Sequence, residues 1–325
     1  MGAWKEIVDY TVPSTTTSVV LDNFGTITKD DFIKIHTTIG SSSFNNIRMT
    51  ANNTVFSNYT SQRLTGDGSS VSAARFNSAS NPQVNRTSGD TTSSAFNYLK
   101  LSQNDRVNYF SNMFQDNGSS VQVSMTYATS NGATFPNGIT SLTFTGANTN
   151  INAGSRIQIY KLTAKKVADI LVTSNTTQVD ITGLDIKKGD EYLLVNDFQR
   201  INLAALYLGI NGNTNLTSYW NQNIRGRGSA PSARRSNNNI INLASTDMRG
   251  LAYTHIKLSN IGAFTYQSYS ILNYNFVSNL GVENWFGSSL AENINSITEL
   301  NIYGDGVGVG ATSRFELYKL YEGGN

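Results

Sequence analysis

The chain has 325 residues, more than one hydrophobic core usually serves, and this length predicts two domains. It contains no cysteine and only two histidines, which excludes disulfides, thiolate chemistry and cysteine-built zinc sites. Its 24 basic and 22 acidic residues give a net charge of +2, too small for general nucleic-acid binding, so we expect no cofactor, no metal and no specific nucleic acid.

The N-terminal segment, from Met1 to Glu6, leads directly into a strand-like pattern and lacks the apolar core of a signal peptide. No apolar run elsewhere in the chain approaches the roughly 18 residues that a membrane-spanning helix needs. We therefore expect no membrane insertion.

The first predicted element runs from Ile7 to Leu21 and returns 160 residues later, from Val167 to Ile181. Both copies carry an aspartate, Asp9 and Asp169, inside an alternating pattern of apolar and polar residues. Alternation with a period of two is typical of a strand with one buried face. We expect both aspartates to be ordinary strand residues.

Adjacent acidic residues follow in both copies, Asp30–Asp31 and Asp190–Glu191, and they suggest a carboxylate pair for glycoside hydrolysis. Such a pair must flank one bond, whereas adjacent residues of a strand point to opposite faces of the sheet. We therefore interpret both pairs as solvated turns that open strands at Phe32 and Tyr192, and we expect no catalytic residues.

The two histidines, His36 and His255, fall at unrelated places of the two copies, and no metal-ligand spacing surrounds either one. We interpret both as ordinary strand residues. The segment from Gly304 to Gly310 lacks the Lys-Ser/Thr pair and the following helix of a phosphate-binding loop, so it predicts a hairpin turn.

Both copies are predicted to be β. In the first copy, apolar residues alternate with polar ones from Val121 to Tyr127, and in the second copy they do so from Leu206 to Ile210. No segment of ten or more residues keeps a helical period. Short strands separated by Gly, Asn and Ser clusters predict an all-β chain of two tandem antiparallel β-sandwich domains of the jelly-roll type.

The closing strand of the first copy, Arg156–Leu162, divides its residues between two faces. We expect Ile157 and Ile159 to point into the core, with Arg156, Gln158 and Tyr160 on the opposite face. The same division is expected for Arg314–Leu320 of the second copy, so the recurring arginine and tyrosine are interpreted as sheet-surface positions.

The whole chain is a repeat of one unit. Residues 139–162 return as residues 297–320, and the stretch from Tyr59 to Arg75 returns as Tyr219 to Arg235 with its glycines Gly66 and Gly68 kept. Self-similarity over a whole domain indicates duplication. We predict one jelly-roll domain at residues 1–162, a linker at 163–166 and a second jelly-roll domain at 167–325.

A basic segment with four arginines, Arg225, Arg227, Arg234 and Arg235, distinguishes the second copy from the first. The residues at the matching positions of the first copy are Thr65, Asp67, Ala74 and Arg75, so only one of those four is basic. Either this segment is an ordinary solvated loop, or it docks on an acidic surface of a neighbouring protein or on an anionic polymer, because arginine binds carboxylate and phosphate bidentately. The candidate partner-binding residues are Arg225, Arg227, Arg234 and Arg235, with the neighbouring aromatics Tyr219 and Trp220.

The closing strands carry a resemblance. The motif from Gly154 to Tyr160, Gly-Ser-Arg-Ile-Gln-Ile-Tyr, and its second copy from Thr312 to Tyr318 resemble those of jelly-roll structural proteins of tailed bacteriophages and related viruses. The opening segments Thr17–Phe32 and Thr177–Tyr192 also resemble that family, and the resemblance covers the whole chain as two copies.

The resemblance implies a non-enzymatic virion component, assembled in the host cytoplasm: a capsid decoration or head-fibre protein, or a tail appendage. Its partners would be other capsid or tail proteins, with self-association as a further expectation. No coiled-coil or collagen-like stalk precedes the first copy, which favours direct docking on the particle. The alternative is a carbohydrate-binding adhesin or receptor-binding protein that contacts a host-surface glycan, and a polysaccharide-degrading enzyme is a third, weaker interpretation.

Overall fold

The computed structural model describes residues 3–66, 70–76, 83–87, 92–116, 121–130, 132–199, 201, 205–212, 219–227, 229–236, 241–244, 249–260, 262–272, 281–289, 294–304 and 308–322. These residues form antiparallel strands and one short 3-10 helix, η1 (Phe56–Asn58). The predicted all-β, antiparallel sandwich fold is therefore confirmed.

The first half of the chain forms two sheets. An eight-stranded sheet has the order β1-β12-β3-β8-β9-β10-β5-β6, and a four-stranded sheet has the order β2-β11-β4-β7. The strands are β1 (Trp4–Thr11), β2 (Ser18–Leu21), β3 (Ile33–Gly40), β4 (Asn45–Ala51), β5 (Tyr59–Gly66), β6 (Val71–Phe76), β7 (Gln83–Thr87), β8 (Thr92–Leu101), β9 (Val107–Asp116), β10 (Val121–Ser130), β11 (Leu142–Gly146) and β12 (Arg156–Leu162).

The second half repeats this order strand for strand: β13-β26-β16-β21-β22-β23-β18-β19 in the large sheet and β14-β25-β17-β20 in the small one. It also has the short pair β15-β24, whose counterpart in the first half is the isolated bridge between Ile27 and Ile139. The strands are β13 (Lys165–Leu171), β14 (Gln178–Ile181), β15 (Ile186–Lys187), β16 (Glu191–Gln199), β17 (Leu206–Ile210), β18 (Tyr219–Arg227), β19 (Ala230–Ser236), β20 (Ile241–Ala244), β21 (Arg249–Leu258), β22 (Phe264–Leu272), β23 (Gly281–Ser289), β24 (Ser296–Ile297), β25 (Leu300–Gly304) and β26 (Arg314–Tyr321).

Each half buries its own hydrophobic core between its large and small sheets. The alternation predicted from the sequence appears directly, since Val19 and Leu21 of β2 are buried while their neighbours are exposed. Val179 and Ile181 of β14 repeat the pattern. This burial of one face per strand explains why the apolar positions recur in the two copies.

The recurring Asp and Arg residues form one ion pair per half. Arg156 of β12 contacts Asp9 of β1, and Arg314 of β26 contacts Asp169 of β13 through two hydrogen bonds of 2.8 and 2.7 Å. The arginine side chain therefore holds the opening strand against the closing strand in each half, which gives the recurrence of Asp9 and Asp169 a structural cause.

The turn before each closing strand has the same geometry in spite of a sequence change. Gly154 has φ of 83° and donates its N–H to the Val12 carbonyl at 2.8 Å. Thr312 takes the equivalent place with φ of 73° and donates to the Val172 carbonyl at 2.7 Å. A β-branched residue is strained in this left-handed region, and the Thr312 hydroxyl partly compensates by donating to Gln199 Oε1 at 3.1 Å.

The connection between the halves is shorter than predicted. Strand β12 ends at Leu162 and β13 begins at Lys165, so Lys165 and Lys166 of the predicted linker lie inside β13. The peptide N–H of Thr163 donates to the Ala3 carbonyl at 2.9 Å.

The interpretation of the acidic pairs as solvated turns is wrong for Asp31 and Asp190. Asp31 accepts the Thr28 N–H at 2.8 Å and contacts Lys161 at 2.6 Å; Asp190 accepts the Lys187 N–H at 3.0 Å in the same way. Both aspartates are buried. Asp31 and Asp190 therefore have equivalent places in the two halves, because each carboxylate accepts a backbone N–H of the turn before its strand. The sequence repeat instead aligns Asp30 with Asp190, one position away.

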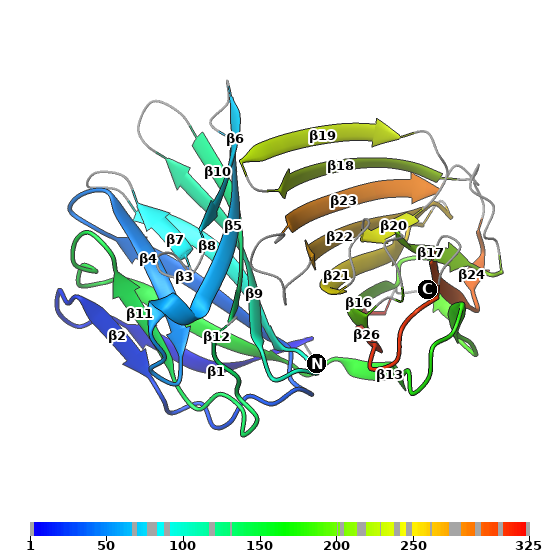
Figure 1. Cartoon of the computed structure of the whole chain (residues 1–325), viewed down its shortest axis with the longest axis horizontal. Helices are drawn as coiled ribbons and strands as arrows, with labels where there is room; N and C mark the ends of the chain where they lie inside the picture. The colour runs from blue at the N-terminus through cyan, green and yellow to red at the C-terminus, as the bar shows by residue number, and fades with distance from the viewer. Residues whose placement is uncertain are drawn as a thin grey trace.

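The large sheets of the two halves pack face to face, with β5, β9 and β10 next to β21, β22 and β23 (Figure 1). Both halves contribute to the hydrophobic cluster between them, which we call the interface cluster. Its buried members are Phe32, Leu64, Phe110, Tyr127, Leu162, Leu193, Val195, Leu251, Tyr253, Val282 and Tyr318. The ring centroids of Phe32 and Tyr253 lie 4.8 Å apart, and those of Phe110 and Tyr269 lie 4.6 Å apart.

Polar contacts cross the interface as well. Lys100 of β8 and Glu316 of β26 form a fully buried ion pair at 2.7 Å, and Asp30 contacts Arg314 at 2.7 Å. The burial of Glu316 and Tyr318 corrects the prediction for the second closing strand, whose outer face is covered where that of the first is not. The reason is that the first half packs against this face.

Candidate functional site

The predicted basic segment is a hairpin of two paired strands, β18 and β19, and the loop interpretation of it is wrong. In the register, Asn223 pairs with Arg234, Gln222 with Arg235, and Arg227 with Ala230. The Arg225 side chain is exposed and its Nε donates to Ser232 Oγ at 2.9 Å, and Trp220 is half-buried. The side chains of the other four candidates, Tyr219, Arg227, Arg234 and Arg235, lie outside the described residues.

The same hairpin also contacts the first half. A Cβ atom on Gly226 would lie 3.3 Å from Gln62 Nε2 of β5 and 3.4 Å from Ala73 Cβ of β6. Ile224 packs on the interface cluster. Gly226 therefore allows close approach of the two halves, whereas a Cβ atom on the matching Gly66 would meet nothing within 4 Å, so part of the second hairpin has a structural role.

The acidic candidates do not converge on a common point. Asp30 contacts Arg314, and this guanidinium lowers the pKa of the Asp30 carboxyl. Asp31 and Asp190 support separate turns, and Glu191 contacts Lys257 at 2.6 Å. The described residues contain no group of three or more side chains that could hold a metal ion. They also contain no helix long and apolar enough to cross a membrane.

The histidines have different environments. His36 of β3 stacks on Phe96 at 4.5 Å and hydrogen-bonds Ser94 and Gln158, so it is a strand residue as expected. His255 is a strand residue of β21, and it also lines a pocket of about 300 Å³. Nothing in the sequence pattern indicates this pocket, because it depends on which part of the large sheet the first half leaves open.

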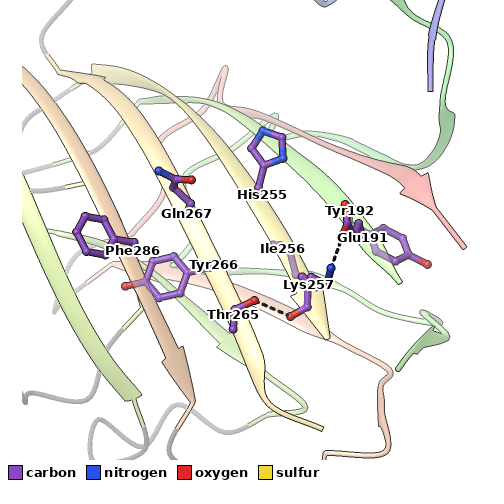
Figure 2. A pocket seen from close by; sticks show the side chains of 9 residues that line it. All are labelled: Glu191, Tyr192, His255, Ile256, Lys257, Thr265, Tyr266, Gln267 and Phe286. Carbon is purple, nitrogen blue, oxygen red and sulfur yellow. Dashed lines mark hydrogen bonds and ion pairs between the residues drawn. The ribbon is translucent and has the colours of Figure 1, made fainter. Parts of the chain in front are cut away.

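The pocket, which we call the polar pocket, lies on the face of the second large sheet that points away from the second core (Figure 2). His255, Gln267 and Phe286 form one row across β21, β22 and β23, since His255 pairs with Gln267 and Gln267 with Phe286. A second row contains Glu191, Lys257 and Thr265, which pair in the same manner. Tyr192, Ile256 and Tyr266 complete the lining.

Charges in the polar pocket are compensated. The Lys257 ammonium lies 2.6 Å from Glu191, and the Thr265 hydroxyl donates to the Lys257 carbonyl at 3.4 Å. Burial lowers the pKa of His255, an effect that the Glu191 carboxylate opposes. The imidazole is therefore neutral at pH 7 and can both donate and accept hydrogen bonds.

The polar pocket borders the first half. The ring centroids of His255 and Tyr98 lie 6.5 Å apart. Burial raises the pKa of Tyr269, and hydrogen bonds with Asn112 of the first half and Gln267 of the pocket oppose the rise.

A row of exposed apolar side chains, which we call the apolar row, lies on the face of the first large sheet that points away from the first core. Phe114, Val123 and Val71 are 46%, 41% and 56% exposed, and Phe96 on the neighbouring strand is 39% exposed. Phe114 pairs with Val123, and Val123 and Val71 both pair with Gly66 of β5, so these side chains share one face.

Comparison with known proteins identifies no family for the chain. No protein-family model matches it, and no curated protein matches it. Among solved structures, domains LG4-5 of the mouse laminin alpha1 chain share 7% identity at a TM-score of 0.20, with 94% of this chain and 86% of that chain covered. The two calcium-bound C2 domains of Extended-Synaptotagmin 2 share 8% identity at a TM-score of 0.15, with 91% and 100% covered.

Proposed function

We propose that the chain is a non-enzymatic structural protein of a bacteriophage virion, which decorates the capsid or forms a head or tail appendage through protein–protein contacts. The observation that carries this proposal is the apolar row of the first half. Exposed large apolar side chains that gather on one face are typical of a surface that another protein covers. The resemblance of the closing strands to jelly-roll virion proteins supports the same function.

The apolar row continues the interface between the two halves. Val123 lies two residues from Met125 on β10, and Met125 already packs on the interface cluster. A virion neighbour that covers the apolar row would enlarge an interface whose adjacent part, the interface cluster, is already buried between the two halves. Burial of each half-exposed side chain contributes about 1 kcal/mol, so the row contributes about 4 kcal/mol before the cost of association.

The interpretation as a non-enzymatic protein is supported by the positions of the acidic candidates. Asp30, Asp31 and Asp190 each hold a separate structural contact within the chain. A glycosidase needs two carboxyl groups about 5 to 10 Å apart that flank the scissile bond. Purified protein should therefore hydrolyse no glycan, and activity lost in Asp30→Asn would contradict this part of the proposal.

The test of the apolar row is incorporation into particles. Phe114→Asp and Val123→Asp place a charge on the row, whereas Leu171→Asp places one on β13 at a side chain that is comparably exposed, at 55%. The proposal expects a loss of incorporation of at least tenfold for the two row variants and no loss for the control. Equal incorporation of all three folded variants would overturn the proposal.

A second candidate function, binding of a host-surface glycan, is favoured by the polar pocket. Its lining combines the aromatic ring of Phe286 with the hydrogen-bonding side chains of His255, Gln267 and Thr265. Ligand sites on sheets commonly combine aromatic rings with a few placed polar groups. A virion protein can hold both functions, since the apolar row and the polar pocket lie on different halves.

A further inference from the structure

The two copies have different residues in the first row of the polar pocket, which holds His255, Gln267 and Phe286. In the first half, Tyr98 pairs with Phe110, and Phe110 pairs with Tyr127, so three aromatic side chains form one row across β8, β9 and β10. All three pack on the interface cluster. The matching strands β21, β22 and β23 carry the row of His255, Gln267 and Phe286 instead.

The match between these rows rests on sequence and register together. Lys100-Leu101-Ser102 of β8 returns as Lys257-Leu258-Ser259 of β21, so Tyr98 corresponds to His255. Pairing along the neighbouring strands then matches Phe110 with Gln267 and Tyr127 with Phe286. The row Tyr, Phe and Tyr of the first half is therefore His, Gln and Phe in the second half, where it lines a pocket, and an amide stands in place of the central aromatic ring.

Packing in the second core does not account for this exchange. The three residues are half-buried and point away from the second core, whose buried members on the same strands include Ile256, Tyr266 and Trp285. A solvated sheet face would be satisfied by residues of many kinds. Here Gln267 lies between His255 and Phe286 in the register, and an amide beside an aromatic ring is typical of a binding site.

The position of the pocket limits the class of ligand. Strands β21, β22 and β23 are each paired on both sides, so their backbone groups cannot accept an added peptide strand. Neighbouring strands lie about 4.8 Å apart, so the first row spans about 10 Å and offers a shallow platform rather than a deep apolar hole. Such a surface suits a flat ligand that lies across the strands.

Charge limits the ligand further. The Lys257 ammonium is compensated by Glu191, and His255 is neutral at pH 7. A phosphate, sulfate or sialate would find no uncompensated cation among the described lining residues. Sugar hydroxyls both donate and accept, as do the His255 imidazole and the Gln267 amide, and the apolar face of a sugar ring can pack on Phe286.

We propose that the polar pocket binds a neutral saccharide. Phe286 packs on the ring face of the sugar, and Gln267 and His255 hydrogen-bond its hydroxyls. The ion pair of Lys257 and Glu191 borders the site and supplies one further donor and acceptor. This proposal rests on the second candidate function, glycan binding, and is independent of the apolar row.

The experiment is saturation-transfer NMR on the full chain with four neutral probes and two anionic ones, each at millimolar concentration. The neutral probes are lactose, maltotriose, cellobiose and diacetylchitobiose; the anionic probes are sialyllactose and a heparin tetrasaccharide. At least one neutral probe should bind, and Gln267→Ala and Phe286→Ala should each weaken it at least tenfold. Phe44→Ala, which removes an exposed aromatic ring from the first half, should leave its affinity unchanged.

Three outcomes would overturn the proposal: no transfer to any neutral probe, transfer to anionic probes alone, or equal affinity in all folded variants. Thermal melting checks that each variant is folded, and His255→Gln provides a conservative variant if Phe286→Ala does not fold. Failure here leaves the virion proposal intact, because particle incorporation is measured without saccharide and depends on the apolar row.

Discussion

The buried ion pair between Lys100 and Glu316 offers the sharpest test of how the two halves are joined. Its two side chains are 1% and 2% exposed, and the Lys100 Nζ also donates to the Lys29 carbonyl at 2.6 Å. Glu316 has two further cations nearby, Lys166 at 2.7 Å and Arg314 at 3.5 Å. The pair is therefore asymmetric: the carboxylate has three cationic partners and the ammonium has one anionic partner.

This asymmetry predicts that replacing Lys100 and replacing Glu316 lower the free energy of unfolding by unequal amounts. Breaking a buried pair by removing one partner costs about 3 to 5 kcal/mol, because an uncompensated charge is left behind. The loss of stability in Lys100→Met should be near the lower value, about 3 kcal/mol, since Lys166 and Arg314 still compensate the charge of Glu316. The loss of stability in Glu316→Gln should be near the upper value, about 5 kcal/mol, because the buried Lys100 ammonium loses its counter-charge.

The pH dependence of the Glu316→Gln variant has a defined sign. Burial already lowers the pKa of Lys100, and Glu316 opposes this effect, so its removal lowers the pKa further. The unfolded chain then binds more protons than the folded one, and stability rises with pH. The cost of Glu316→Gln should therefore shrink between about pH 7 and about pH 10, whereas the cost of Lys100→Met should not.

The assay is urea unfolding followed by circular dichroism, with the double variant Lys100→Met, Glu316→Gln completing the cycle. The double variant should cost less than the sum of the two single variants by at least about 1 kcal/mol, because it leaves no uncompensated ammonium. A cost of Glu316→Gln that is below that of Lys100→Met, or that does not change with pH, would refute the reasoning.

Three further predictions concern single sites. Thr312→Gly should stabilise the chain by about 1 kcal/mol in the same assay, because glycine tolerates the φ of 73° that strains threonine. A loss of stability would mean that the hydroxyl contact with Gln199 outweighs this strain. The lowered pKa of His255 means that the folded chain binds fewer protons than the unfolded one, so stability should fall as the pH drops below about 6.5. His255→Gln should reduce this fall in stability. Identical pH profiles of the variant and the parent protein would contradict this prediction. Arg225→Ala combined with Arg227→Ala should weaken adsorption to host cells or particles and reduce its salt dependence without unfolding the chain, and unchanged adsorption would assign the hairpin a structural role alone.

Much of the fold could be predicted because it depends on local alternation. The buried Ile157 and Ile159 and the exposed Arg156 follow from a period of two within one strand. The one-residue error at Asp31 arose because the sequence alignment matched similar letters, whereas the structure matches the carboxylates that support the turns. Local turn chemistry, and not residue similarity, fixes that position.

The packing of the two halves could not be predicted from either copy alone. Glu316 and Tyr318 occupy a face that is polar by pattern, and their burial depends on the opposite sheet. The polar pocket was missed for the same reason, since His255 and Gln267 look like ordinary strand residues until the uncovered part of the sheet is known. A comparison of matched positions between the two copies could have found the exchange of Tyr98 for His255.

The most direct test of the virion proposal is a cryo-electron microscopy map of native particles. The proposal predicts two-lobed density of the size of this chain, in regular copies on the capsid or tail, with the apolar row of Phe96, Phe114, Val123 and Val71 covered by a neighbouring protein. Particles that lack the chain, or density in which the row faces solvent and the opposite surface makes the contact, would contradict it.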